Sequence, residues 1–301
     1  MEITMEVNPG DLKDNQTASN WKEMGITRLS LGIQSLREKD LQILDRKHTA
    51  AEAFRACEIA TDEFDQVSID LIYGRTREDS PDEWRQELRQ ALSLGAKHLS
   101  LYSLTLKPRT QLHKLVRKGN RHLTSEKSVV EMMHINLEET KVVKGHECAH
   151  NMAYWTMGDY IGVGPGAHSR FSVGADYHSL KEKEPQSSIE SAEKTKRRVG
   201  LRQIMSPQQW TKAMEGDGSR VDQEEIISGK DVVMERILVG LRMTKGLPLS
   251  QWSDAVDRGV INNEAVDELV ARELIKIDNE RVRVSEEGFL LLDAVTAKLL
   301  V

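Results

Sequence analysis

The stretch VSIDLIYG, residues 67–74, alternates apolar residues with Ser68 and Asp70 before it ends at a tyrosine and a glycine. A period of two is typical of a β-strand whose two faces have different surroundings. Similar stretches lie at 3–7, 28–33 and 98–104. Helical patterns separate them, so the sequence predicts strand–helix repeats of about 30 to 40 residues with parallel pairing and crossover helices.

The segments between these strands carry helix signals, at 19–24, 38–44, 50–61 and 81–95. Ser80-Pro81 marks the last start most clearly, because a cap residue precedes a proline at the first helical position. An α/β barrel and a doubly wound sheet both fit this order. The polar residues inside each strand favour the barrel, since one face then lines a polar cavity.

The second half of the chain has a different pattern. A helix is predicted at 125–140, a solvated charged loop over 167–198, and a short helix after Ser206-Pro207. From about residue 223 the order is helix (232–241), helix (264–272), hairpin (274–277 with 281–284) and helix (286–300), which resembles a winged-helix unit. The predicted domains are 1–171, a partial barrel; 172–222, a charged linker with a short helix; and 223–301, the C-terminal winged-helix-like unit.

Composition excludes several classes of protein. The 301 residues are 39% hydrophobic and 30% charged, with a net charge of −6 and no apolar run near the roughly 18 residues of a membrane span. Residues 226–301 hold ten basic and thirteen acidic side chains, so we expect no nucleic-acid binding and favour a protein-contact or lid role for this unit. The first residues show no secretory or transit signal.

Polar residues close each predicted strand, where ligand sites of parallel α/β barrels lie. They are Glu6, Asn8, Gln34, Asp70, Tyr73 and Thr105. Each has a structural alternative, in which Glu6 caps the next helix and Asp70 binds a loop amide. Together they favour a ligand, because carboxylates and an amide at one barrel mouth can hold an amino group and ribose hydroxyls.

A second cluster is GHECAHNMAYW at 145–155, in which His146, Cys148 and His150 recur at intervals of two. In an extended segment this spacing places all three on one face. Imidazole and thiolate are ligands of metals and of haem iron, and Tyr154 and Trp155 offer flat apolar surface for a macrocycle. The alternative is a loop in which His150 caps backbone and Trp155 is core. DYIGVGPGAHSR follows, and its glycines predict a tight barrel-closing turn.

Several motifs occur in order: EVNPG at 6–10, GITRLSLGIQSL at 25–36, KHTAAEA at 47–53, SIDLIYG at 68–74, HLSLYSLTLKP at 98–108 and HNMAYWTMGDYIGVGPGAHSRF at 150–171. Together they resemble the radical SAM family of coproporphyrinogen III oxidase-like proteins. The HNxxYW motif resembles the signature of the haem-chaperone branch of that family. The likeness continues through GLRMTKGL at 240–247. The resemblance implies an α/β fold, a partial (β/α) radical SAM-type barrel with the winged-helix-like unit behind it.

The resemblance also implies cofactors and site residues. Glu6, Gln34 and Asp70 are expected to face S-adenosylmethionine, with Arg28 assisting. His150, Asn151, Tyr154 and Trp155 are expected to face haem, with Cys148 or His150 as the iron ligand. No residue is assigned as catalytic, because the family's CxxxCxxC and GGGTP segments belong before EVNPG and are absent from this sequence.

Cys57 and Cys148 are the two cysteines, too few for a [4Fe-4S] cluster or a disulfide framework. The chain therefore resembles a truncated or alternatively spliced product, or an incomplete gene model. ETKVVKG at 139–145 also stands where the family has a stretch resembling GFxxYExSNFA. We expect residues 3–7 to form an open sheet edge and the chain to melt below about 60 °C.

The leading hypothesis is a haem-binding, chaperone-like protein that delivers haem to respiratory haem proteins, without radical chemistry in this chain. The alternatives are an oxygen-independent coproporphyrinogen III oxidase-like enzyme, if a cluster segment is present, and a non-enzymatic protein-interaction module. The expected partners are haem and haem-accepting proteins, which include a membrane-associated acceptor. The resemblance favours a mitochondrial location, or a cytoplasmic one if the source is bacterial.

Overall fold

The computed structural model describes residues 2–108, 110–140, 148–174, 197–216, 219–227 and 229–301. The chain forms two compact units, residues 1–150 and 151–301, called here the N-terminal and C-terminal units. This division differs from the boundaries expected after residues 171 and 222. The predicted stretch at 139–145 lies mostly outside the described residues, as does His146.

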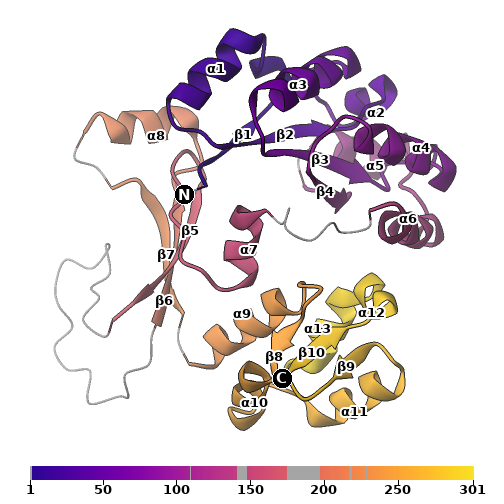
Figure 1. The fold of residues 1–301 in the computed structure, drawn as a ribbon, viewed down its shortest axis with the longest axis vertical. Helices are drawn as coiled ribbons and strands as arrows, with labels where there is room; N and C mark the ends of the chain where they lie inside the picture. Colours follow the sequence, from indigo (N-terminus) through magenta and orange to yellow (C-terminus); the bar gives the residue numbers. More distant parts are fainter. Residues whose placement is uncertain (1, 109, 141–147, 175–196, 217–218, 228) are drawn as a thin grey trace. The chain divides into compact units, whose positions relative to one another are not determined.

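The N-terminal unit is built on one parallel sheet of four strands in the order β1-β2-β3-β4 (Figure 1). Each of the four predicted strands is confirmed. The strands are β1 (Thr4–Val7), β2 (Arg28–Gln34), β3 (Val67–Tyr73) and β4 (His98–Ser103). The helices are α1 (Asn15–Glu23), α2 (Glu38–Ile43), α3 (Ala50–Glu63), α4 (Pro81–Leu92), α5 (Gln111–Arg117) and α6 (Glu126–Glu139). Among the described residues β1 pairs with β2 alone and is an edge, as predicted.

Two helices begin where the sequence signals them most clearly. Thr49 and Glu52 form a capping box at the start of α3, and Ser80 and Glu83 form another at α4. In each box the hydroxyl accepts from the third residue's N–H while the glutamate accepts from the cap residue's N–H, so two otherwise unpaired donors are satisfied.

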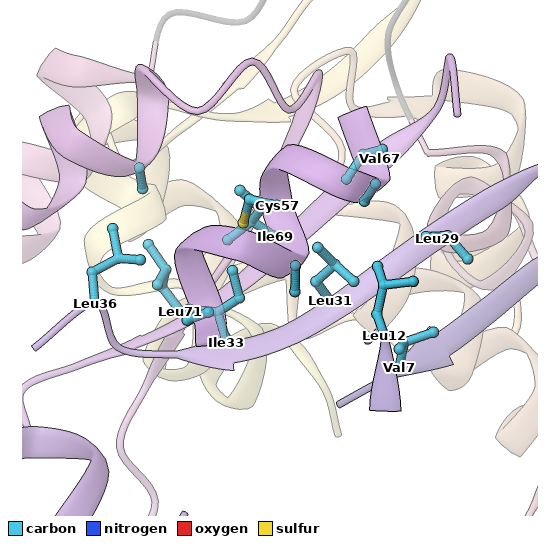
Figure 2. Close-up of a cluster of buried hydrophobic side chains, with 14 of the residues drawn as sticks. Val7, Leu12, Leu29, Leu31, Ile33, Leu36, Cys57, Val67, Ile69 and Leu71 are labelled. Atoms are coloured by element: carbon cyan, nitrogen blue, oxygen red, sulfur yellow. The ribbon is translucent and has the colours of Figure 1, made fainter. Parts of the chain in front are cut away.

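One face of the parallel sheet carries the hydrophobic core. Leu29, Leu31 and Ile33 of β2 and Ile69 and Leu71 of β3 are fully buried there. Figure 2 shows these side chains gathered beneath a helix that contributes Cys57. The helix is α3, whose core-facing positions are mostly alanine, and these small side chains let its backbone approach the sheet closely. The opposite face of the sheet is therefore free for polar residues.

The C-terminal unit contains two further sheets. β5 (His168–Val173), β6 (Arg197–Gln203) and β7 (Val221–Ile227) pair antiparallel in the order β5-β6-β7, with α8 (Pro207–Met214) between the last two in sequence. The second sheet has the order β8-β10-β9. Its elements are α9 (Lys230–Gly240), β8 (Leu247–Pro248), α10 (Leu249–Asp257), α11 (Asn263–Ala271), β9 (Ile275–Ile277), β10 (Arg281–Val284), α12 (Glu286–Leu290) and α13 (Leu292–Leu299).

The antiparallel sheet corrects the linker prediction for 172–222. Residues 197–203 and 221–227 are strands, and β7 extends past the expected boundary at 223. β6 was not predicted from the sequence, because RRVGLRQ places Arg198 and Arg202 on one face and Val199 and Leu201 on the other. Arg202 pairs with Asp222 of β7 at 2.5 Å, so the charges that suggested a loop support the sheet instead.

The helices predicted at 232–241 and 264–272 and the hairpin predicted at 274–284 are present as α9, α11 and β9 with β10. Their core holds Leu247, Trp252, Ile275, Val282 and Leu299. Two details differ from the prediction: α10 was not expected, and the helix expected over 286–300 is interrupted at residue 291, between α12 and α13. No helix in the described part of the chain is long and apolar enough to cross a membrane.

Candidate functional site

The face of the parallel sheet opposite the core is polar and carries two of the predicted residues, Glu6 and Asp70. The register pairs Glu6 of β1 with Ser30 of β2, and Asp70 of β3 with Ser100 of β4. The Ser30 hydroxyl donates to the Asp70 carboxylate at 3.4 Å. Burial raises the pKa of Asp70, and the negative charge of Glu6 adds to that shift, while hydrogen bonds from Ser100 and Ser30 oppose it. Glu6 and Asp70 thus lie on the same face of the sheet, with β2 between their strands, and the charge of Glu6 influences Asp70 without a direct contact.

Arg28 lies on the same face at the amino ends of the strands. Its side chain is 1% exposed and donates to the Ser68 hydroxyl at 3.1 Å from Nε and 2.9 Å from Nη2. It also contacts Glu2 at 3.4 Å. These bonds give Arg28 a role in the fold, and its expected assistance in ligand binding stays a prediction.

Gln34 lies at the carboxyl end of β2, where the strand bulges. The register shifts between Leu31 and Gln34, and Gln34 has a left-handed backbone with φ of 69°. A Cβ atom on Gly32 would lie 3.1 Å from the Gln34 side-chain nitrogen, so the absence of that atom makes room for the amide. A left-handed glutamine costs about 1–2 kcal/mol, and such strain is concentrated at functional sites.

An open cleft of about 740 Å³ lies at the carboxyl ends of β2, β3 and β4. Gln34 and Thr105, two of the six strand-end residues expected at a ligand site, line it together with Tyr102. Glu6 and Asp70 are not among its lining residues. The structure therefore places the three residues predicted for S-adenosylmethionine on one side of the sheet, but only Gln34 reaches the cleft.

Positively charged side chains that were not predicted from the strand ends also line the cleft. Arg46 enters it from the loop after α2, and Lys107 and Lys114 enter it from the segment that follows β4. The ring nitrogen Nε2 of buried His48 lies 3.0 Å from the Ile33 carbonyl oxygen, which holds the Arg46 loop against the end of β2. The KHTAAEA motif begins at residue 47, directly after Arg46. This position beside a family motif could have identified Arg46 as a candidate site residue.

The later part of the second cluster forms the helix α7 (Ala149–Trp155). Of the three residues spaced by two, His146 lies outside the described residues and Cys148 precedes the helix, so their common face stays a prediction. Cys148 is buried just before the helix, and its charge contributes to a raised pKa of Tyr102, for which burial is the main cause. The His150 side chain lies outside the described residues, and Asn151 is half-buried.

The end of α7 is fixed within the C-terminal unit. The Tyr154 ring packs edge-on against Tyr160, with 4.4 Å between ring centroids, and Trp155 lines a small pocket of about 130 Å³. Arg198 of β6 donates to the carbonyl oxygens of Met157 at 2.6 Å and Gly158 at 3.3 Å. Tyr160 then bridges to Arg170, so the glycine-rich segment is a turn into β5. That turn enters an antiparallel sheet and does not close a barrel.

A [4Fe-4S] cluster does not fit the cysteines of this chain. Cys57, on the core-facing side of α3, is fully buried, and burial raises its pKa to about 12, which suppresses the thiolate that ligates iron. The described residues contain no group of three or more His, Cys, Asp and Glu placed to hold a metal. Cysteine ligands for a cluster would have to come from outside these 301 residues.

Asp70 gives a testable pH dependence. A raised pKa means that the folded state binds the proton more tightly, so its contribution to stability is complete at low pH and is lost as pH rises through the folded-state pKa. Asp70→Asn is therefore expected to raise the melting temperature at pH 7, with a gain that shrinks toward pH 4. Thermal unfolding across this range measures it, with the exposed Asp65→Asn as the control. A loss of stability at pH 7 would contradict the assignment.

Comparisons with known proteins agree with this architecture. The family model HemN C-terminal domain matches residues 227–291. The mitochondrial radical S-adenosyl methionine domain-containing protein 1 of Dictyostelium discoideum is 31% identical over 99% of this chain and 68% of its own length. The protein of the same name from Mus musculus is 30% identical over 99% and 67%.

A bacterial relative and a solved structure extend the comparison. Heme chaperone HemW of Escherichia coli is 33% identical over 61% of this chain and 51% of its own length. The solved Escherichia coli coproporphyrinogen III oxidase HemN, described as a radical SAM enzyme, superposes with a TM-score of 0.70 at 16% identity, covering 99% of this chain and 69% of that one. At that identity the superposition establishes the fold alone.

Proposed function

Because the chain belongs to the radical SAM, coproporphyrinogen oxidase-like family that contains heme chaperone HemW and radical S-adenosyl methionine domain-containing protein 1, we propose that it binds haem as a chaperone-like carrier. The observation that carries the proposal is the placement of the HNMAYW segment. It forms α7, and bonds from Arg198 fix the backbone just beyond it, with Trp155 at a pocket. A fixed indole gives a macrocycle a preformed surface.

In this proposal His150, Asn151, Tyr154 and Trp155 contact haem, and Cys148 or His150 ligates its iron. His150 is the first candidate, because imidazole is a common axial ligand and Cys148 is buried. One edge contact of the Tyr154 ring is made with Tyr160, which fixes the ring beside the proposed haem contact. Haem is the cargo here, so no bond of the macrocycle needs to be made or broken by the protein.

A haem titration tests the proposal. The wild-type chain is expected to give a Soret band at a defined stoichiometry, and His150→Ala is expected to shift and weaken it because an axial ligand is lost. His122→Ala, which removes an exposed histidine, is the control and should leave the spectrum unchanged. If both variants match the wild type, His150 is not the ligand; if the wild type binds no haem, the carrier function is wrong.

We also propose that the N-terminal unit retains an S-adenosylmethionine site. The cleft volume of about 740 Å³ lies within the roughly 300–1,000 Å³ of small-molecule sites. Gln34 can bind ribose hydroxyls, and the Arg46 guanidinium suits the methionine carboxylate. Glu6 and Asp70 do not line the cleft, so their expected contact with S-adenosylmethionine stays a prediction. Calorimetry with S-adenosylmethionine measures the affinity, which we expect to fall about tenfold in Arg46→Gln.

Radical chemistry is not proposed for these 301 residues, because their two cysteines do not fit the cluster. Iron and sulfide analysis of the purified chain distinguishes a carrier from a coproporphyrinogen oxidase-like enzyme. Haem-accepting proteins, including respiratory ones, are the partners that the carrier role requires. A mitochondrial location is part of the proposal, because the Dictyostelium discoideum and Mus musculus relatives are named as mitochondrial.

A further inference from the structure

The pocket beside Trp155 is lined by several positively charged side chains. Its volume is about 130 Å³, and Arg236, Lys245 and Arg281 line it together with Met157 and Met243. Three cations therefore surround a small space within the C-terminal unit of a chain whose net charge is −6. Such a concentration of positive charge attracts an anion far more strongly than the overall composition would.

Two of these cations have no acidic partner among the described residues. Arg236 lies 3.4 Å from Asp254. Arg281 instead donates from Nη1 to the backbone carbonyl oxygens of Gly246 at 2.9 Å and Lys245 at 3.4 Å, and no ion pair is formed by Arg281 or by Lys245 within the described part of the chain. The two carbonyl bonds hold the Arg281 guanidinium in place and leave its full charge available.

The size and the lining of the pocket indicate what kind of anion fits. At about 130 Å³ the pocket is smaller than the roughly 300 Å³ at which small-molecule sites begin, so a macrocycle does not enter it. A short chain of methylene groups that ends in a carboxylate is small enough to enter the pocket. Trp155 and the two methionines supply apolar surface for the methylene groups of such a chain, and the cations supply charge-assisted hydrogen bonds for its carboxylate.

We propose that this pocket is a carboxylate subsite that takes a propionate arm of a porphyrin whose ring lies against Trp155. The inference rests on the proposed haem binding and adds to it the group that orients the ring. Arg281 and Lys245 act on the carboxylate, whereas iron ligation is left to the segment around Cys148 and His150. The two contributions are separable, because the iron can be removed from the ligand without altering the propionates.

Protoporphyrin IX, the metal-free porphyrin, and its dimethyl ester test the subsite on the full chain. Binding is followed by porphyrin fluorescence. We expect the wild type to bind the diacid at least tenfold more tightly than the ester, and Lys245→Gln and Arg281→Gln to weaken diacid binding about tenfold while leaving ester binding unchanged. Arg272→Gln, an exposed arginine paired with Glu268, is the control and should bind both ligands like the wild type.

The possible outcomes separate the subsite from the haem proposal. Equal binding of diacid and ester, or full diacid affinity in Lys245→Gln and Arg281→Gln, overturns the subsite even if haem still binds. Competition by millimolar acetate or phosphate would assign the pocket to free anions and also overturn it. Absence of both haem and protoporphyrin binding to the wild type overturns both proposals. Lys245 is exposed, so its variant remains informative if Arg281→Gln does not fold.

Discussion

Arg75→Met is expected to lower the free energy of unfolding of the N-terminal unit by about 3–5 kcal/mol, the range for breaking a fully buried ionic network. The Arg75 side chain is 0% exposed and lies 2.6 Å from Glu87 and 2.9 Å from Asp79. Both carboxylates are also buried. Removing the guanidinium leaves the two carboxylates with Arg37 alone, 3.4 Å from Asp79 and 4.0 Å from Glu87, and the cost comes from burying charge that is no longer fully paired.

Urea unfolding followed by circular dichroism measures this effect. The matched control is Arg121→Met, which removes an exposed pair with Glu78 at 3.5 Å and is expected to change stability by less than about 1 kcal/mol. If Arg75→Met unfolds within about 1 kcal/mol of the wild type, the network contributes little and the carboxylates find water or protons instead.

Gly246→Ala is expected to destabilise the C-terminal unit by about 2–5 kcal/mol, which combines left-handed strain with overpacking. Gly246 has φ of 68°, and an added methyl group would overlap the Val282 carbonyl oxygen. Val282 pairs with Leu247 across β10 and β8, so the overlap forces these strands apart. The same change would disturb the Gly246 carbonyl that accepts from Arg281.

Gly259→Ala separates the two contributions. Gly259 has φ of 63°, but the nearest atom to an added methyl group is the mobile end of Lys230 at 3.7 Å. This control carries the strain without the overlap and should cost about 1–2 kcal/mol. Thermal unfolding of both variants measures the difference. Equal losses of stability in the two variants would show that β10 shifts to accommodate the methyl group without further destabilisation.

The parallel sheet was predictable because each strand carries its own signal. In β2 and β3 the core face is apolar and the other face holds Ser30, Ser68 and Asp70, so the period of two fixes both the strand and its orientation. Crossover helices then follow from chain order. The antiparallel sheet was not predictable in this way, because β6 alternates arginine with aliphatic residues and its charges resemble those of a solvated loop.

The candidate sites were predictable only in part. The period of two in β1 and β3 places Glu6 and Asp70 on the same face of the sheet, which the sequence pattern implies. Arg46 was missed because it reaches the cleft through a loop held by His48, a contact between positions distant in sequence. The cationic pocket was also missed, since Arg281 and Trp155 are 126 positions apart in the chain and meet only through tertiary packing.

The bulge at Gln34 has a further consequence, because the next residues are clamped. The Ser35 hydroxyl donates to Glu87 at 2.5 Å, and the Leu36 N–H donates to the same carboxylate at 2.7 Å. These bonds hold the backbone directly after Gln34 and so help to preorganise its left-handed geometry. Because Arg75 also donates to the Ser35 hydroxyl, we expect a substitution in the Arg75–Glu87 network to alter the position of Gln34 and, with it, the affinity for the proposed ligand.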